Sequence, residues 1–156
     1  MSHTALVTGG AGFIGSHIGD ALIKADYRVA VVDNLSAGKR SSVNPAARFV
    51  WADVRDREAI RRIFDEEKPE VVFHEAAQND SRNSMRQPAY DAEVNIVGML
   101  NVLESARAVG TRKIIYASSG GTIYGHVDTS HPTTEGQHMT HPSSAYGISK
   151  LTAEFY

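Results

Sequence analysis

The chain has 156 residues, of which 42% are apolar and 22% are charged, and its formal net charge is −2. This composition is typical of a globular protein, and the length suits one domain with a substantial core. The small net charge provides no basic field, which argues against nucleic acid and anionic membranes as partners. The chain has no cysteine, which excludes disulfides, thiolate catalysis and cysteine metal sites. We expect one domain over residues 1–156 and a cytoplasmic location, because neither a leader sequence nor a membrane-spanning apolar run is found.

A glycine turn stands between an apolar run at residues 5–7 and a helical pattern that follows it. Glycine lets the backbone turn tightly and approach a pyrophosphate, and the N–H groups of a first helical turn favour negative charge. The segment therefore fits a dinucleotide site, although the spacing G-x-x-G-x-x-G also fits an ordinary turn between strand and helix. The glycines are Gly9, Gly12 and Gly15, and the apolar residues expected on one helix face are Ile14, Ile18 and Leu22.

A second apolar run, residues 28–32, ends in Asp33. In a nucleotide-binding βαβ unit, a carboxylate about 20 residues beyond the glycines accepts both hydroxyls of the adenosine ribose. It also repels a 2′-phosphate, so Asp33 predicts NAD in preference to NADP. Lys39 and Arg40 follow closely and would suit a phosphate, which leaves NADP open as the alternative.

Five short, almost continuously apolar runs alternate with helical patterns, as expected for parallel strands covered on both faces. Such βα units with right-handed crossovers form a doubly wound parallel α/β sheet, the Rossmann fold, with the predicted strand order 3-2-1-4-5. After the first two runs, the apolar segments are residues 48–52, 70–74 and 113–117.

Two helices are predicted between the later strands. Asp56 is expected to cap the first helix, and Gly110 is expected to end the second, which runs from about Pro88 to Ala108. The residues expected to face inward are Ile60, Ile63 and Phe64 in the first helix and Val94, Val97, Leu100 and Leu103 in the second.

The segment from Gly125 to Ser144 is polar and has no apolar period, which predicts a loop. Its histidines match no common spacing of metal ligands, so we expect no metal site. Ser143 or Ser144 then begins a final helix, which runs to Tyr156 without a stop signal. A doubly wound domain normally adds at least one more strand at this point, so we expect the sequence to be the first part of a longer protein. The histidines are His126, His131, His138 and His141.

Tyr146 and Lys150 lie four residues apart and therefore on one face of this final helix. A helix after the fifth strand is expected to bring them to the carboxyl ends of the strands, where the nicotinamide end of a dinucleotide lies. An ammonium group near a phenol lowers the pKa of the phenol, which would make Tyr146 a usable base. Ser118 and Ser119 are placed to offer a hydroxyl to the same substrate oxygen, although serine is also common in turns at strand ends.

Seven motifs span the chain: T-G-G-A-G-F-I-G-S-H at 8–17, D-N-L-S at 33–36, A-D-V at 52–54, H-E-A-A-Q at 74–78, N-I-V-G at 95–98, S-S-G-G-T-I-Y-G at 118–125 and Y-G-I-S-K at 146–150. Jointly they resemble the extended short-chain dehydrogenase/reductases. Within that family they are most similar to the NAD-dependent epimerases and dehydratases, above all the UDP-glucose (UDP-galactose) 4-epimerase group. The resemblance covers the amino-terminal part of such enzymes.

The resemblance implies a role for each matching residue. The glycine turn would cradle the pyrophosphate of NAD, and the residues after the second, third and fourth strands would contact the ribose, the adenine and the rest of the cofactor. The catalytic residues would be Ser119, Tyr146 and Lys150. The cofactor-binding residues would be Gly9, Gly12, Phe13, Ile14, Gly15, Asp33, Asn34, Asp53, Val54, Ala76, Ala77, Gln78, Asn95, Ser118, Tyr146 and Lys150, with Asn95 either structural or in contact with NAD.

The sequence departs from the family pattern in three ways. Glu75 stands where an apolar or aromatic residue is usual. The stretch 118–121 is one residue longer than in the best-known epimerases, which leaves Ser118, and more remotely Thr122, as alternatives to Ser119. The family's carboxy-terminal part, which binds the nucleotide-sugar, is absent.

The implied reaction is inversion at carbon 4 of a UDP-hexose, with NAD as a tightly held cofactor and Tyr146 as the base. Related nucleotide-sugar dehydratases and decarboxylases carry acidic residues just after the reactive hydroxyl. Here those positions are Gly120 and Gly121, which favours epimerisation. A second alternative is a cofactor-binding fragment without catalysis. The resemblance also implies a homodimer paired through residues 88–108 and 144–156.

Overall fold

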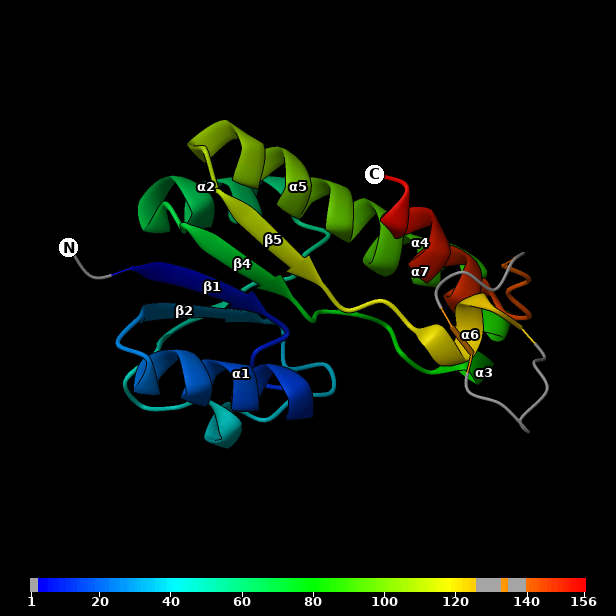
Figure 1. The fold of residues 1–156 in the computed structure, drawn as a ribbon, viewed down its shortest axis with the longest axis horizontal. Helices are drawn as coiled ribbons and strands as arrows, with labels where there is room; N and C mark the ends of the chain where they lie inside the picture. Colours follow the sequence, from blue (N-terminus) through cyan, green and yellow to red (C-terminus); the bar gives the residue numbers. More distant parts are fainter. Residues whose placement is uncertain (1–2, 126–132, 135–139) are drawn as a thin grey trace. The chain divides into compact units, whose positions relative to one another are not determined.

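The computed structural model describes residues 3–125, 133–134 and 140–156, and these divide into two units. Unit 1 comprises Met1–Ala77 and Val97–Ala117, and unit 2 comprises Gln78–Ile96 and Ser118–Tyr156. Unit 1 carries the sheet, whereas the described part of unit 2 is built from helices and loops (Figure 1). The single domain expected over residues 1–156 stays a prediction.

Five parallel strands form the sheet of unit 1 in the order β3-β2-β1-β4-β5, which confirms the predicted Rossmann topology. Thr8, the last residue of β1, lies opposite Val32 of β2 and His74 of β4, so the carboxyl ends of these strands meet at one edge. Ligands of doubly wound sheets bind at that edge. The strands are β1 Thr4–Thr8, β2 Arg28–Asp33, β3 Arg48–Trp51, β4 Val71–His74 and β5 Lys113–Tyr116.

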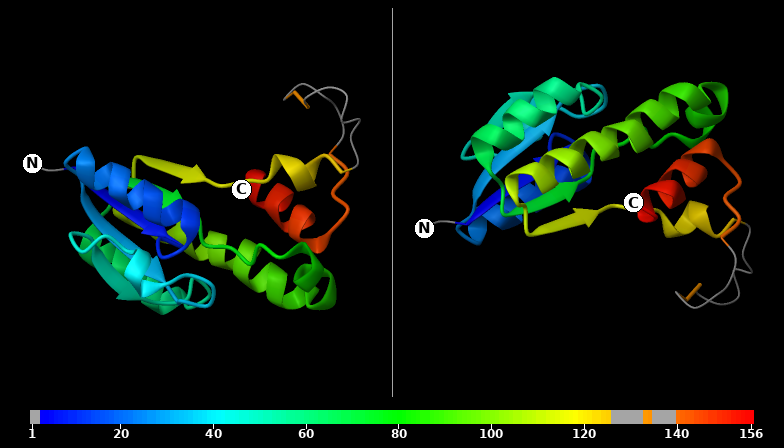
Figure 2. Two further views of the ribbon diagram at one scale, coloured as in Figure 1. Left: turned by 90° about the horizontal axis from the view of Figure 1, so that it is seen from below. Right: turned by 90° about the horizontal axis from the view of Figure 1, so that it is seen from above.

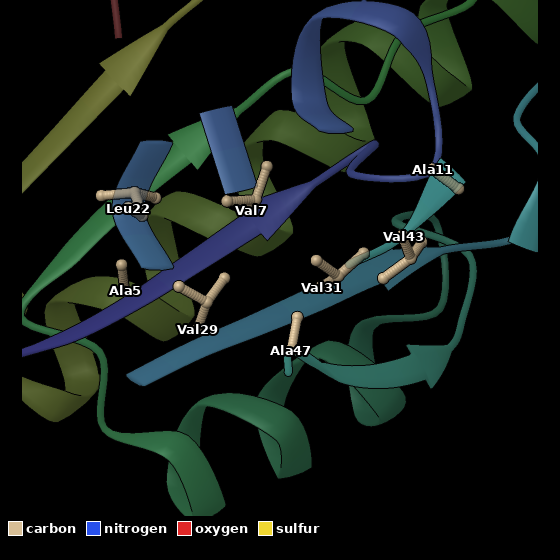
Figure 3. Packing of buried hydrophobic residues seen from close by; sticks show 8 residues of the cluster. All are labelled: Ala5, Val7, Ala11, Leu22, Val29, Val31, Val43 and Ala47. Atoms are coloured by element: carbon tan, nitrogen blue, oxygen red, sulfur yellow. The ribbon is translucent and has the colours of Figure 1, made fainter. Parts of the chain in front are cut away.

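Helices cover both faces of the sheet. α1 (Phe13–Lys24) lies on one face, and α2 (Arg57–Glu67) and α5 (Gly98–Val109) lie on the other (Figure 1). Successive side chains of a strand point to opposite faces, so strands covered on both sides are apolar throughout. Figure 3 shows the core on the α1 side, which comprises Ala5, Val7, Ala11, Leu22, Val29, Val31, Val43 and Ala47.

The predicted start and buried face of α2 are confirmed. The carboxylate of Asp56 accepts a hydrogen bond of 3.0 Å from the backbone N–H of Ala59, which caps the helix. The three predicted inward residues, Ile60, Ile63 and Phe64, are buried. Between β2 and β3 the chain forms only the short 3₁₀ helix η1 (Arg40–Ser42).

Glu67, at the end of α2, is a buried carboxylate that two arginines hold. Arg28 donates to it at 2.5 Å and also to its backbone carbonyl at 3.0 Å, and Arg48 donates to its second carboxylate oxygen. A buried charge is stable only when it is paired in this way. Because Arg28 and Arg48 begin β2 and β3, these bonds fix α2 to the amino ends of both strands.

The long helix expected over residues 88–108 is interrupted. It consists of α4 (Pro88–Ala92), the π-helical segment η2 (Glu93–Val97) and α5, and Gly110 ends it as predicted, with a φ of 76°. A π turn adds one residue and so rotates all later side chains about the helix axis. The predicted inward face is therefore wrong beyond Val94. Val97 is 46% exposed, Leu100 and Leu103 are only half-buried, and Met99, Val102 and Ala106 face the core instead.

Unit 2 is organised around α7 (Ala145–Glu154), which packs against α3 (Ser81–Arg86), α4 and α6 (Gly120–Ile123). In Figure 2, α7 is the orange-to-red helix beside the yellow α6. None of the helices in the described ranges is long and apolar enough to cross a membrane.

The sequence predicted the start of α7 better than its end. Ser144, one of the two predicted caps, accepts a hydrogen bond of 3.1 Å from the N–H of Gly147. The expectation that the helix reaches Tyr156 is wrong, because it ends at Glu154. The N–H of Phe155 donates to the carbonyl of Thr152, three residues back, at 3.1 Å, and this tighter turn closes the helix.

Candidate functional site

The glycine turn of unit 1 is shaped by an approach between backbones that only glycine permits. Gly9 follows β1 with a φ of +68°, and its N–H donates to the carbonyl of Val32 at 2.8 Å. A Cβ on Gly9 would lie 2.6 Å from the backbone nitrogen of Ala76, and a Cβ on Gly15 would overlap the carbonyl of Gly9. The first turn of α1 is thereby drawn close against the carboxyl ends of β1 and β4.

The amino end of α1 fits a phosphate group. Gly12 is the N-cap residue and offers no side chain to cap the helix, and the first turn contains no acidic residue. The N–H groups of a first helical turn lack partners within the helix and carry partial positive charge. Phe13 and Ile14 are 82% and 59% exposed, so this turn faces outward. These residues therefore fit the pyrophosphate of a dinucleotide, and their contact with NAD stays a prediction.

Asp33 links the glycine turn to the loop that follows β2. Its side chain is buried, with one oxygen accepting from the N–H of Ala11 at 3.0 Å and the other from the N–H of Leu35 at 2.7 Å. Each carboxylate oxygen has a further lone pair, so these bonds leave acceptor capacity for ribose hydroxyls. The sequence predicted that Asp33 contacts a ligand but did not predict its hydrogen bonds to the backbone, which fix the carboxylate in place.

Asn34 and Asp53 lie together where β2 and β3 end. The amide of Asn34 donates to Asp53 at 2.9 Å, and Trp51 donates through its indole N–H to the carbonyl of Asn34 at 3.2 Å. Arg55 donates to both carboxylate oxygens of Asp53, and this hydrogen bonding lowers the pKa of Asp53 to about 2. Asp53 is therefore an anion at neutral pH. Val54, the next predicted adenine contact, is buried, and its carbonyl accepts from Asn101 at 2.9 Å.

The two basic residues that kept NADP open are both exposed. The backbone N–H of Lys39 donates to the carbonyl of Ala11 at 3.0 Å, which holds the loop after β2 against the glycine turn. The guanidinium of Arg40 lies 4.6 Å from the centre of the Phe49 ring. This cation–π contact gives Arg40 a partner within the protein.

The end of β4 is braced by Thr8. The hydroxyl of Thr8 accepts from the N–H of Ala76 at 3.3 Å and lies 2.8 Å from Nδ1 of the buried His74. Ala76 and Ala77 are half-buried, as is Glu75, the residue that departs from the family pattern. Ala76 thus contacts both Thr8 and Gly9, so it belongs to the wall of the glycine turn.

In unit 2, Tyr146 is partnered by Ser119. The hydrogen bond with the Ser119 side chain favours the phenolate, whereas burial and the negative charge of Asp91 disfavour it, and the net effect raises the pKa of Tyr146. The other two candidate hydroxyls are engaged elsewhere. Ser118 donates to the carboxylate of Glu154, and Thr122 donates to the carbonyl of Ser119 at 3.2 Å.

Lys150 is 2% exposed, and its Nζ lies over the ring of Tyr146, 5.7 Å from the ring centre. The expectation that Lys150 lowers the pKa of Tyr146 is wrong for this structure, in which that pKa is raised. The physical reason is that the half-buried phenol loses water and has the Asp91 carboxylate nearby, both of which favour the neutral form.

A buried polar network that the sequence analysis missed surrounds Gln78 and Asn95. Asn95 accepts from the backbone N–H of Gln78 at 3.0 Å and donates to its carbonyl at 2.9 Å, so it fixes the backbone of Gln78, and a contact with NAD stays a prediction. The Gln78 side chain donates to the carbonyl of Asp80 and to the carboxylate of Asp91, each at 3.0 Å. The available signal was the spacing of Asp91 and Asn95, which places two polar residues on the inward face of one helix.

The four histidines considered as metal ligands are only partly within the described residues. His126, His131 and His138 lie outside them, and His141 is exposed. Among the described residues, no group of three or more histidine, aspartate or glutamate side chains is arranged to hold a metal ion.

The profile of the NAD dependent epimerase/dehydratase family matches residues 5–156. The chain belongs to this family. It is 40% identical to the UDP-glucose 4-epimerase of Mycolicibacterium smegmatis over 97% of its own length and 49% of that protein. The fold, the family and the dependence of the family on NAD agree with the expectations from the sequence.

Two solved structures are also similar to this chain. A UDP-glucose 4-epimerase of Thermotoga maritima with UDP-glucose is 48% identical, with a TM-score of 0.94 over 98% of this chain and 49% of the other. A UDP-glucose 4-epimerase of Thermus thermophilus in complex with NAD is 44% identical, with the same TM-score and coverage. The chain thus spans about half the length of the relatives it matches.

Replacing Gly9 with alanine is expected to destabilise unit 1 by at least about 2 kcal/mol, because it adds strain at positive φ to a clash with the backbone of Ala76. The control is Gly19→Ala on α1, where an added Cβ meets no atom within 4 Å. That change is expected to stabilise the helix by about 0.5–1 kcal/mol. Urea unfolding of both variants measures the difference, and equal midpoints would contradict the packing described for the turn.

Proposed function

We propose that this chain is the NAD-binding and catalytic part of an enzyme that inverts carbon 4 of a UDP-hexose, interconverting UDP-glucose and UDP-galactose. The observation that carries the proposal is the group formed by Ser119, Tyr146 and Lys150 in unit 2 of a chain from this family. The glycine turn and Asp33 of unit 1 supply the features that a dinucleotide needs. The UDP-glucose 4-epimerases that match the chain support the choice of reaction.

Bound NAD would supply the chemistry of taking a hydride from carbon 4 of the sugar and returning it to the other face. In its phenolate form, Tyr146 would accept the proton of the sugar 4-hydroxyl at its phenolic oxygen and later return it to oxygen 4 of the sugar. Ser119, which already hydrogen-bonds Tyr146, would hold that sugar oxygen beside it. The ammonium group of Lys150 would favour the phenolate once substrate and cofactor have displaced water.

Two other functions remain as alternatives. A nucleotide-sugar dehydratase or decarboxylase of the same family would need acidic side chains after Ser119, but Gly120 and Gly121 stand there and favour epimerisation. A fragment that binds NAD without catalysis would carry the same unit 1.

A homodimer paired through residues 88–108 and 144–156 and a cytoplasmic location stay predictions. The exposure of Val97 and Ile148, two apolar residues on the paired segments, supports the homodimer.

NAD is expected to bind more tightly than NADP, because the Asp33 carboxylate repels a 2′-phosphate. Asp33→Asn keeps one acceptor oxygen and the size of the side chain but removes the charge, so it should narrow the preference by roughly tenfold. Asp65→Asn, at an exposed position on α2, removes the same charge away from the turn and should change nothing. Calorimetric titration with both nucleotides provides the measurement, and equal affinities for the unmodified chain would rule out the assigned role of Asp33.

The reaction can be tested in a fusion of this chain to the carboxy-terminal half of the Thermotoga maritima epimerase. We expect the fusion to convert UDP-galactose to UDP-glucose and the chain alone to be far slower, since catalysis needs the sugar held in an aligned pose. Tyr146→Phe should lower kcat of the fusion by at least about 100-fold, because it removes the general base. Tyr27→Phe, the same chemical change in unit 1, is the control.

A fusion that binds NAD yet converts no UDP-galactose would favour the non-catalytic alternative. A product that has lost water or carbon dioxide would favour the dehydratase or decarboxylase. Full activity of the Tyr146→Phe fusion would contradict the role given to Tyr146.

A further inference from the structure

Asp91 of α4 is a fully buried carboxylate held by three donors from three segments of unit 2. One oxygen accepts from the side-chain amides of Gln78 and Asn95, each at 3.0 Å, and the other accepts from the hydroxyl of Ser149 at 2.7 Å. These three donors are all neutral. Burial of a carboxylate is unfavourable unless hydrogen bonds replace its water, and here the network supplies them.

The bond to Ser149 places Asp91 next to the candidate catalytic residues. Ser149 immediately precedes Lys150 and lies three residues after Tyr146, so it sits within the catalytic stretch of α7. A second buried residue, Ser84 of α3, accepts from the backbone N–H of Tyr146 at 3.1 Å. Two points of attachment along a helix fix its rotation about its own axis. The hydrogen bonds of Ser84 and Asp91 therefore set the direction in which Tyr146 projects from α7.

We propose that Asp91 is a positioning residue for the reaction: its buried carboxylate holds α7 through Ser149 with Tyr146 facing Ser119, and it places a fixed negative charge beside the phenol. This inference rests on the proposed function for its catalytic meaning. The attachment of α7 and the effect of the Asp91 charge on Tyr146 are properties of this chain alone. Both can therefore be measured without substrate or cofactor.

The charge of Asp91 opposes ionisation of Tyr146, in the direction found for the pKa of that phenol. The charged groups on the packed elements differ in exposure. Lys150 lies buried over the Tyr146 ring, α6 carries no charged residue, and Arg82 and Arg86 of α3, Glu93 of η2 and Glu154 of α7 are exposed. Because water screens exposed charges, the buried Asp91 is the charged group that raises the pKa of Tyr146. A neutral Tyr146 at rest is the expected consequence.

The test is a pH titration of the tyrosines of the whole chain, labelled with ¹³C at the ring carbon that bears the hydroxyl and followed by NMR. Tyr146→Phe identifies the Tyr146 signal by its loss. Asp91→Asn keeps an acceptor for Gln78 and Asn95, and its amide can donate to Ser149, while the charge is removed. The titration midpoint of Tyr146 should then fall by roughly 0.5–1 pH unit.

Glu93→Gln is the matched control, because it removes an exposed carboxylate two residues away. It should leave the Tyr146 midpoint unchanged. An unchanged midpoint in Asp91→Asn, or an equal fall in Glu93→Gln, would overturn the electrostatic role.

Ser149→Ala tests the positioning role and does not depend on the folding of Asp91→Asn. It leaves the Asp91 charge bonded to two amides but removes the attachment of α7. Hydrogen exchange should accelerate at least about tenfold in residues 147–153 and stay unchanged in α5. Unaltered exchange in α7 would overturn the positioning role.

In the active fusion, Ser149→Ala should lower kcat more than it raises KM. An inactive fusion with the expected NMR shifts would refute the proposed reaction and leave the placement of Asp91 intact. An active fusion in which Asp91→Asn leaves the titration midpoint of Tyr146 unchanged would refute this inference and leave the proposed reaction intact.

Discussion

The backbones of Gly9 and Ala76 approach so closely that no side chain fits between them, and the candidate cofactor site of unit 1 depends on this contact. It lets the chain leave β1 at a positive φ and begin α1 directly at the carboxyl edge of the sheet. The N–H groups of the first helical turn therefore face the place where parallel strands end. Asp33 at the end of β2 and Thr8 at the end of β1 secure the same turn, with hydrogen bonds to Ala11 and to Ala76, which follows β4. Rigid positioning of this kind is what lets short loops bind a charged ligand.

Unit 2 follows a different physical rule, because its candidate residues are held by buried polar groups. Asp91 and Ser84 attach α7 by hydrogen bonds, and their burial makes these bonds expensive to leave unmade. Such networks favour one set of hydrogen-bond partners over the alternatives. The two adjacent serines illustrate this, because Ser119 pairs with Tyr146 whereas Ser118 pairs with Glu154. The hydrogen bonding thus singles out one hydroxyl for the proposed reaction.

The sequence predicted the sheet because short, continuously apolar runs are typical of strands that are covered on both faces. It also predicted the start of α2 and the end of α5, because Asp56 and Gly110 have specific capping chemistry. The sequence did not predict which side chains of α5 face the core. The π-helical segment before α5 inserts one extra residue into a turn and so turns Val97 outward, and no local sequence pattern indicates such an insertion. The pKa of Tyr146 also escaped prediction. It depends on burial and on Asp91, which lies 55 positions earlier in the chain, whereas the sequence showed only the nearby Lys150. Spacing identifies candidates, but the partners of a side chain come from the fold.

The central claim is that NAD binds on the glycine turn of unit 1, and amide NMR of the ¹⁵N-labelled chain tests it most directly. On addition of NAD, the largest chemical-shift changes should fall on residues 9–15, with further changes at residues 33–36 and 53–54. The amides of α2, on the far side of the sheet from α1, should be unaffected. Saturating shifts confined to other residues, or none at millimolar NAD, would contradict the account.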